Sequence, residues 1–150
     1  MIQIDTENIV DRKFIGVPYK FGGKSFDGAD CMGLILLWYM EQGIEFDYHE
    51  KTARNMKVFW ERRPAECLTL VSSYGSFIPF HQIQKYDFLL FYGGTKDETF
   101  PTFPAVMVDD RYFLSNLDKT TSRITMLSIE WKNRFWGAIK ISKAVDKGIR

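Results

Sequence analysis

The sequence predicts an α+β protein in which helices come first and an antiparallel sheet follows. An apolar stretch that begins after Asp30 and ends near Gly43 has the start and stop residues of a helix, and short aliphatic and aromatic runs follow from position 85. Short turns between these runs favour an antiparallel meander, and helices segregated from such a meander define the α+β class. The chain has 150 residues, of which 45% are hydrophobic, which suits one domain with one core.

The first expected element is a short helix over residues 6–14. Thr6 is a suitable N-cap, Glu7 lies in the first turn, and two basic residues lie in the last turn. Acidic residues near the start of a helix and basic residues near its end match the helix dipole. Pro18 marks a point at which this helix has ended.

A glycine-rich loop over residues 19–30 leads into the second expected helix. The Asp27-Gly28 pair signals a turn, and Asp30 is a good N-cap. Cys31 is therefore expected in the first helical turn, where unpaired backbone N–H groups favour a thiolate. This placement suits a nucleophile, but a single cysteine on an apolar helix also suits a small buried hydrophobic residue. Spacing alone leaves both interpretations open.

The middle of the chain carries weaker signals. Residues 52–63 have an amphipathic pattern that predicts a helix, and residues 68–74 continue with a weakly helical pattern. Gly75 and Pro79 are expected to interrupt that pattern.

The C-terminal half predicts five strands. Aliphatic and aromatic residues dominate each run, and turn residues such as Asp109-Asp110 separate them. The expected strands cover residues 85–92, 105–108, 112–114, 122–127 and 135–141. The domain is expected to span residues 1–141, and the polar residues 142–150 are expected to form a C-terminal tail.

Composition excludes several classes of function. The formal net charge is +1, so no overall attraction to nucleic acid or acidic membranes is expected. The longest apolar run is far shorter than the roughly 20 residues that cross a bilayer. Two cysteines and two histidines form no disulfide framework and no zinc-binding spacing, so we expect neither a metal nor a cofactor. Synthesis in the cytoplasm is expected.

The residues around Cys31 resemble a known motif. Residues 17–19, the Gly22-Gly23 pair and residues 30–34 are similar to the nucleophile motif of the NlpC family, papain-like cysteine peptidases that cut peptide links in bacterial cell-wall peptidoglycan. An aromatic-rich helix followed by residues 41–44, Glu-Gln-Gly-Ile, resembles the subgroup found in phage tails and gene transfer agents. Met32 departs from the pattern, because serine usually follows the cysteine.

The second half carries the same resemblance. Residues 85–91 are similar to the Gly-Asp-aliphatic strand of the family, with Tyr86 at the usual place of glycine. Residues 122–124 and 134–139 resemble its closing strands. The resemblance therefore covers most of the chain and implies a papain-like fold, with the cysteine helix packed on the sheet.

The resemblance also implies a set of site residues. Cys31 corresponds to the nucleophile, and Tyr19 to the tyrosine that helps form the oxyanion site. The expected position of the base histidine falls on Phe103, and Thr102, Pro104 and Ala105 cannot replace a histidine either. The third position, which orients the base, falls on Ser115 or Asn116. His81 is an alternative base, and His49 is expected at the surface.

Three hypotheses about function follow. In the first, a degenerate NlpC-like domain is a structural part of a phage tail tip or related particle, with other tail or particle proteins as its partners. The chain would be made in the cytoplasm of the bacterial host and assembled into the virion. In the second, the domain is an active peptidoglycan peptidase that uses Cys31, Tyr19 and an unusual base. In the third, the domain holds peptidoglycan peptides without cutting them.

Overall fold

The computed structural model describes residues 9–44, 68, 71–92, 101, 103–116 and 120–141. In these residues the chain forms a six-stranded antiparallel sheet with the strand order β3-β8-β4-β5-β6-β7. The strands are β3 (Gly75–Ile78), β4 (Phe88–Phe91), β5 (Phe103–Met107), β6 (Tyr112–Ser115), β7 (Arg123–Met126) and β8 (Phe135–Ile141). The expected α+β class is confirmed.

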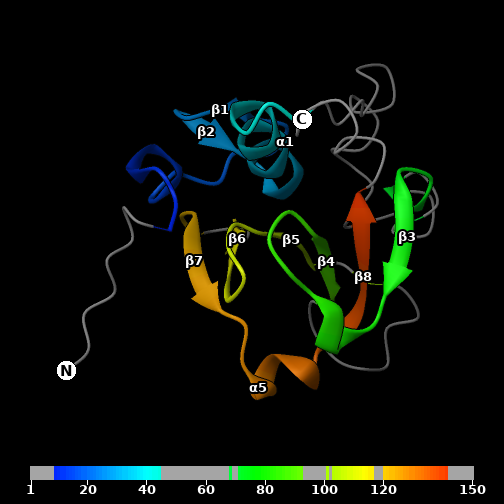
Figure 1. Cartoon of the computed structure of the whole chain (residues 1–150). Coiled ribbons are helices and arrows are strands. Elements are labelled where there is room, and N and C mark those ends of the chain that lie inside the picture. Colours follow the sequence, from blue (N-terminus) through cyan, green and yellow to red (C-terminus); the bar gives the residue numbers. More distant parts are fainter. Residues whose placement is uncertain are drawn as a thin grey trace.

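Helices lie on two sides of this sheet. Helix α1 (Cys31–Glu41) and the small hairpin of β1 (Lys24–Ser25) and β2 (Gly28–Ala29) lie together on one side, and α5 (Ile129–Lys132) lies on the opposite side (Figure 1). Helix α1 packs against β5 and β6. The α1 face of the sheet therefore carries the segment that holds Cys31.

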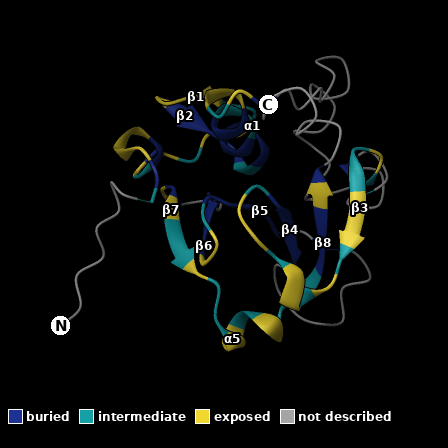
Figure 2. Ribbon diagram, in the orientation of Figure 1, coloured by how far each residue is buried: buried dark blue, intermediate teal, exposed yellow. Residues whose placement is uncertain are grey.

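Each face of the sheet has its own hydrophobic core. On the α1 face, Phe88, Val106 and Leu114 pack with buried residues of α1. On the opposite face, Phe91, Phe103 and other residues of the central strands form a second cluster, against which Trp131 of α5 packs. Because side chains alternate along a strand, neighbouring residues supply different cores. Strands β4, β5 and β6 are therefore buried on both faces (Figure 2).

The second core is mainly aromatic. The Phe91 ring lies 5.0 Å from Trp131, 5.3 Å from Phe113 and 5.7 Å from Phe103, measured between ring centroids. The Arg134 guanidinium lies 4.8 Å from the Trp131 ring, and its Nε and Nη2 donate to the Tyr92 carbonyl oxygen at 3.3 and 3.1 Å. Among the described residues, α5 and Arg134 thus pack against this aromatic cluster on the face away from α1.

The structure differs from the sequence expectations at several elements, which include the β1–β2 hairpin within the expected loop and the helix α5. Residues 12–14 form a 3-10 helix, η2 (Arg12–Phe14), capped by the Asp11 carboxylate, which accepts from the Lys13 backbone N–H at 3.0 Å. Residues 6–8 and 52–63, where helical structure is also expected, lie outside the described residues. Strand β3 was not expected, because Gly75 was interpreted as an interruption.

Gly75 is instead required by strand pairing. A Cβ atom at this position would lie 1.8 Å from the carbonyl oxygen of Lys140 in β8. The absence of a side chain lets β3 approach β8 closely enough to pair with it. A glycine that resembles a breaker in the sequence is thus part of the sheet.

Tyr86 adopts a backbone conformation that favours glycine. Its φ is +82°, in the left-handed region, and its N–H donates to the Met107 carbonyl at 2.9 Å. Its carbonyl oxygen accepts from the Tyr39 hydroxyl at 2.6 Å, and its ring lies 5.7 Å from the Trp38 ring. Hydrogen bonds at both the N–H and the carbonyl therefore fix this backbone conformation. Glycine adopts it without strain, which gives a physical reason why glycine is usual at this position of the NlpC motif.

We expect the substitutions Tyr86→Gly and Tyr86→Ala to separate backbone strain from ring packing. Both lose the contact with Trp38, but only glycine relieves the positive φ. The glycine variant should be more stable than the alanine variant by about 1 kcal/mol. Urea denaturation measures the difference, and an alanine variant as stable as the glycine variant would show that the conformation carries no strain.

Candidate active site

Cys31 is the first residue of helix α1. The Asp30 carboxylate caps the helix by accepting from the Gly33 N–H at 2.6 Å, and its second oxygen accepts from the Gly22 N–H at 3.1 Å. A Cβ atom on Gly33 would lie 2.1 Å from the Gly23 carbonyl oxygen, so only glycine allows the loop to approach the helix here. Cys31 is half-buried and packs against the core of the α1 face. The expected helix start is thus observed.

Tyr19 lies beside the segment that leads to Cys31. It forms a parallel bridge with Ala29, and its N–H donates to the Thr120 carbonyl at 3.1 Å. The next residue, Lys20, donates its N–H to the Ala29 carbonyl at 3.2 Å. Tyr19 is half-buried, and this pairing holds its backbone next to the residue two positions before Cys31.

Asn116 ties β6 to the same segment. Its side-chain Nδ2 donates to the Ala29 carbonyl at 2.9 Å and to the Val17 carbonyl at 3.2 Å. Its Oδ1 is buried and has no hydrogen-bond partner among the described residues. Asn116 is 1% exposed, so this amide is a buried clamp between the sheet and the loop that precedes Cys31.

Phe103 does not face α1. It pairs with Phe91 across β4 and β5, and both side chains belong to the core on the opposite face of the sheet. Pro104 pairs with Leu90, which belongs to the α1-side core. Because the faces alternate along a strand, Pro104 and not Phe103 is the residue at the start of β5 that lies on the α1 face. The position expected for the base, Phe103, thus lies on the face away from α1, and its neighbour Pro104 lies on the α1 face.

The pairing of β5 with β6 agrees with this placement of Pro104. Val106 pairs with Leu114, and continuing the antiparallel register brings Pro104 opposite Asn116. Ser115 pairs with Arg123 of β7 and lies on the other side of β6 by alternation. Of the two residues expected at the third position, the structure thus brings Asn116, and not Ser115, to the side of Cys31.

His81 is placed far from this site. It lies in the 3-10 helix η3 (Phe80–Gln82) between β3 and β4 and is exposed. This segment lies at the end of the sheet away from α1 (Figure 1). The second histidine, His49, lies outside the described residues.

Two buried ionisable groups, Tyr39 and Asp87, lie near the N-terminal end of β4. Burial raises the pKa of the Tyr39 hydroxyl well above its ordinary value, and the nearby Asp87 carboxylate adds to this shift. Burial also raises the pKa of Asp87, although its hydrogen bond from the Gln84 N–H and the Lys140 charge lower it. Asp87 is 2% exposed, so its charge is costly in the folded state.

This shift predicts the effect of Asp87→Asn on stability. A carboxyl whose pKa is higher in the folded than in the unfolded state favours folding at low pH and loses that contribution as pH rises through the folded-state pKa. Asparagine keeps the acceptor for the Gln84 N–H and removes the charge. The variant should therefore be more stable than the wild type at neutral pH, and the difference should shrink on acidification. Thermal unfolding between acidic and neutral pH measures this trend, and a difference that is constant with pH would contradict it.

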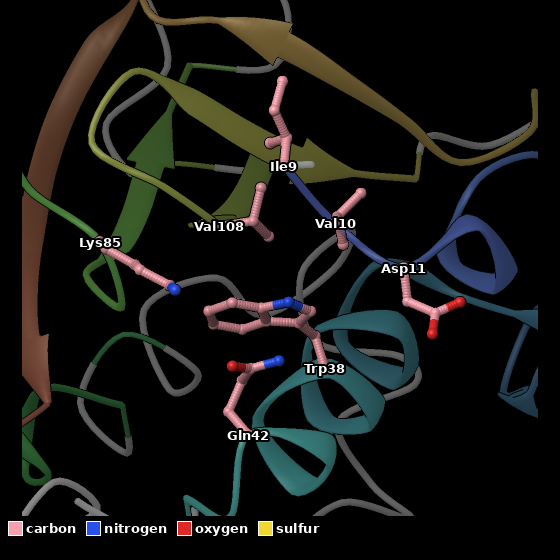
Figure 3. Close-up of a pocket in the computed structure, with 7 residues that line it drawn as sticks. All are labelled: Ile9, Val10, Asp11, Trp38, Gln42, Lys85 and Val108. Atoms are coloured by element: carbon pink, nitrogen blue, oxygen red, sulfur yellow. The ribbon is translucent and has the colours of Figure 1, made fainter. Parts of the chain in front are cut away.

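A small hollow lies at the other end of α1. Its volume is about 140 Å³, and in Figure 3 the Lys85 ammonium and the Gln42 amide point toward the ring of Trp38. Its other lining residues are Ile9, Val10, Asp11 and Val108. Trp38 lies seven positions after Cys31, roughly 10 Å along the helix axis. The hollow is therefore not part of the cysteine site.

Within the described residues, no group of three histidine, cysteine or acidic side chains is arranged to hold a metal ion. No helix in the same part of the chain is long and apolar enough to cross a membrane.

Comparison with known proteins agrees with the observed fold. A sequence model of the NlpC/P60 family matches residues 16–140. Among solved structures, an NlpC/P60 family protein from Bacillus cereus ATCC 10987 is similar over 93% of this chain and 41% of its own, with a TM-score of 0.59 and 17% identity. The NlpC/p60 domain of the peptidoglycan hydrolase SagA is similar over 91% of this chain and 99% of its own, with a TM-score of 0.53 and 18% identity.

A third structure, a lipoprotein-like NLP/P60 family protein from Staphylococcus aureus subsp. aureus Mu50, is similar over 93% of this chain and 43% of its own, with a TM-score of 0.50 and 21% identity. The chain thus spans less than half of the first and third structures. No curated protein matches the sequence.

A cysteine at the start of a helix that packs on an antiparallel sheet is the arrangement expected of the papain-like class. Within that class, the chain belongs to the NlpC/P60 family, whose model covers most of its length.

Proposed function

We propose that this NlpC/P60 domain has lost peptidase activity and is a structural part of a phage tail tip or related particle. The observation that carries the loss of activity is Pro104. It lies on the α1 face of β5, opposite Asn116 by register, and its side chain cannot accept or donate a proton. General base catalysis typically contributes about 10²- to 10⁴-fold, so a cysteine without a base would be a very poor peptidase.

The contacts of Asn116 give it a structural role that is independent of catalysis. An orienting residue would offer its side-chain oxygen to the N–H of a base. Here the amide nitrogen is engaged by two backbone carbonyls, and the buried Oδ1 has no partner among the described residues. The side chain thus acts as a structural clamp, which gives a reason for its presence that does not require catalysis.

The proposed setting is a virion. The resemblance of residues 41–44 to tail proteins and the 16% aromatic content support a role in assembly, with other tail or particle proteins as partners. In this proposal the chain is made in the cytoplasm of the host and then assembled into the tail.

The alternative function is an active peptidoglycan peptidase with Cys31 as nucleophile, Tyr19 in the oxyanion site and a non-standard base. The structural similarity to a peptidoglycan hydrolase favours keeping this candidate. The position of His81 at the far end of the sheet argues against this histidine as the base.

Digestion of purified peptidoglycan separates the two functions. The wild type and Cys31→Ala should both release no more muropeptides than buffer, while an active NlpC/P60 hydrolase releases them. A Cys67→Ala variant is the matched control for loss of a thiol. Cleavage by the wild type that is lost in Cys31→Ala alone would overturn the loss of activity. If muropeptides bind at the Cys31 site but are not cut, the result would instead favour a domain that holds peptidoglycan peptides without cleaving them.

Assembly is tested on particles. Antibodies against the chain should label purified phage particles from a producing host, and the chain should be detected in them by mass spectrometry. A chain that is expressed in the host but absent from purified particles would contradict the proposed setting.

A further inference from the structure

A second, larger groove lies on the face of the sheet away from α1. Its volume is about 500 Å³, within the range of small-ligand sites. It is bounded by η3, by the end of β3 and by one residue of β8. The lining residues are Ile78, His81, Gln82, Ile83, Gln84 and Lys140.

The groove combines an apolar base with polar donors. Ile78 and Ile83 are partly buried and pack against the second core, so they form a fixed apolar surface. The exposed Lys140 ammonium and the His81 imidazole are both available to a ligand, and two carboxamides add further donors. None of the described residues that line the groove is acidic.

One described acidic group, Asp87, lies buried near the Lys140 side of this groove. Asp87 is 2% exposed and close enough to Lys140 for their charges to interact. Its carboxylate oxygen is engaged by the Gln84 N–H at 2.8 Å. Because this carboxylate is buried and the ammonium is exposed, the groove presents positive charge and hydrogen-bond donors to solvent.

We propose that this groove binds the terminal carboxylate of a short peptide that ends in a small apolar residue. The ammonium of Lys140 pairs with the carboxylate, the amides of Gln82 and Gln84 bond the peptide groups, and the apolar side chain rests on Ile78 and Ile83. The site is separate from Cys31 and does not depend on whether the domain cleaves peptidoglycan.

Titration with model dipeptides tests the site. The probes are N-acetyl-alanyl-alanine in the D,D and L,L forms and the same dipeptides with a C-terminal amide. Binding is measured by NMR of the full chain. We expect a carboxylate form to bind with a Kd of about 1 mM and to shift the signals of His81, Gln82 and Gln84. The D,D form represents cell-wall peptides and the L,L form represents protein C-termini, so the preferred form identifies the source.

Variants make the test specific. Lys140→Gln should weaken carboxylate binding at least about tenfold, because a hydrogen bond to a charged group is lost. His81→Ala should weaken it to a smaller extent. Lys24→Gln, which removes another exposed lysine in β1, is the matched control and should bind as the wild type does. The proposal would be overturned if the amide forms bound as tightly as the carboxylate forms, or if Lys140→Gln bound the carboxylate forms as the wild type does. It would also be overturned if about 10 mM of a carboxylate probe shifted no signals.

Discussion

Placing a histidine at position 104 is expected to activate Cys31. An ordinary cysteine is only a few per cent thiolate at neutral pH, and a neighbouring imidazole raises that fraction. Pro104 lies on the α1 face and, by continuing the register of β5 and β6, opposite Asn116, whose buried Oδ1 has no hydrogen-bond partner among the described residues. Pro104→His should therefore raise the rate of alkylation of Cys31 at neutral pH by about tenfold.

Phe103→His is the matched control for this prediction. Its side chain belongs to the aromatic core on the opposite face, so the same imidazole one residue earlier should destabilise the protein and leave alkylation of Cys31 unchanged. Iodoacetamide kinetics at several pH values, with Cys31→Ala as blank, measure both variants. Faster alkylation in Phe103→His than in folded Pro104→His would show that the strand faces are assigned wrongly.

Truncation of Phe91 is expected to give a large loss of stability. Its side chain is fully buried, and its ring packs against rings from β5, β6 and α5. A large-to-small change in such a core costs about 3–5 kcal/mol, because it removes buried apolar surface and leaves a cavity. Phe91→Ala should lose this much free energy of unfolding in urea denaturation.

Phe77 provides the comparison on an exposed surface. It is 53% exposed, and its ring lies 6.1 Å from that of Trp136. Phe77→Ala should cost less than about 1 kcal/mol. Similar losses in the two variants would contradict the assignment of the second core as a main source of stability.

The fold could be predicted from the sequence largely because its signals are local. Asp30 and Gly43 mark the ends of the cysteine helix, and the helix ends where Gly43 adopts a φ of +74°. Strands β4 to β8 follow runs of aliphatic and aromatic residues. Strand β3 could not be predicted, because Gly75 is explained only by the approach of Lys140 from another strand.

The site was predicted less completely, for the same reason. Cys31 and its cap are neighbours in the sequence and were found together. The face on which Phe103 lies depends on its pairing with Phe91, and a shift of one residue along a strand reverses the face. The choice between Ser115 and Asn116 likewise depends on long-range contacts with Val17 and Ala29.

The separate core behind the sheet has an evolutionary consequence. The rings around Phe91 stabilise the central strands from the face that no substrate at Cys31 would touch. The central strands can therefore stay paired while residues on the Cys31 side change in evolution. Residues of the motif can therefore be kept because the fold needs them, and not only because the chemistry does. Asp30, Gly33 and Asn116 have such structural contacts.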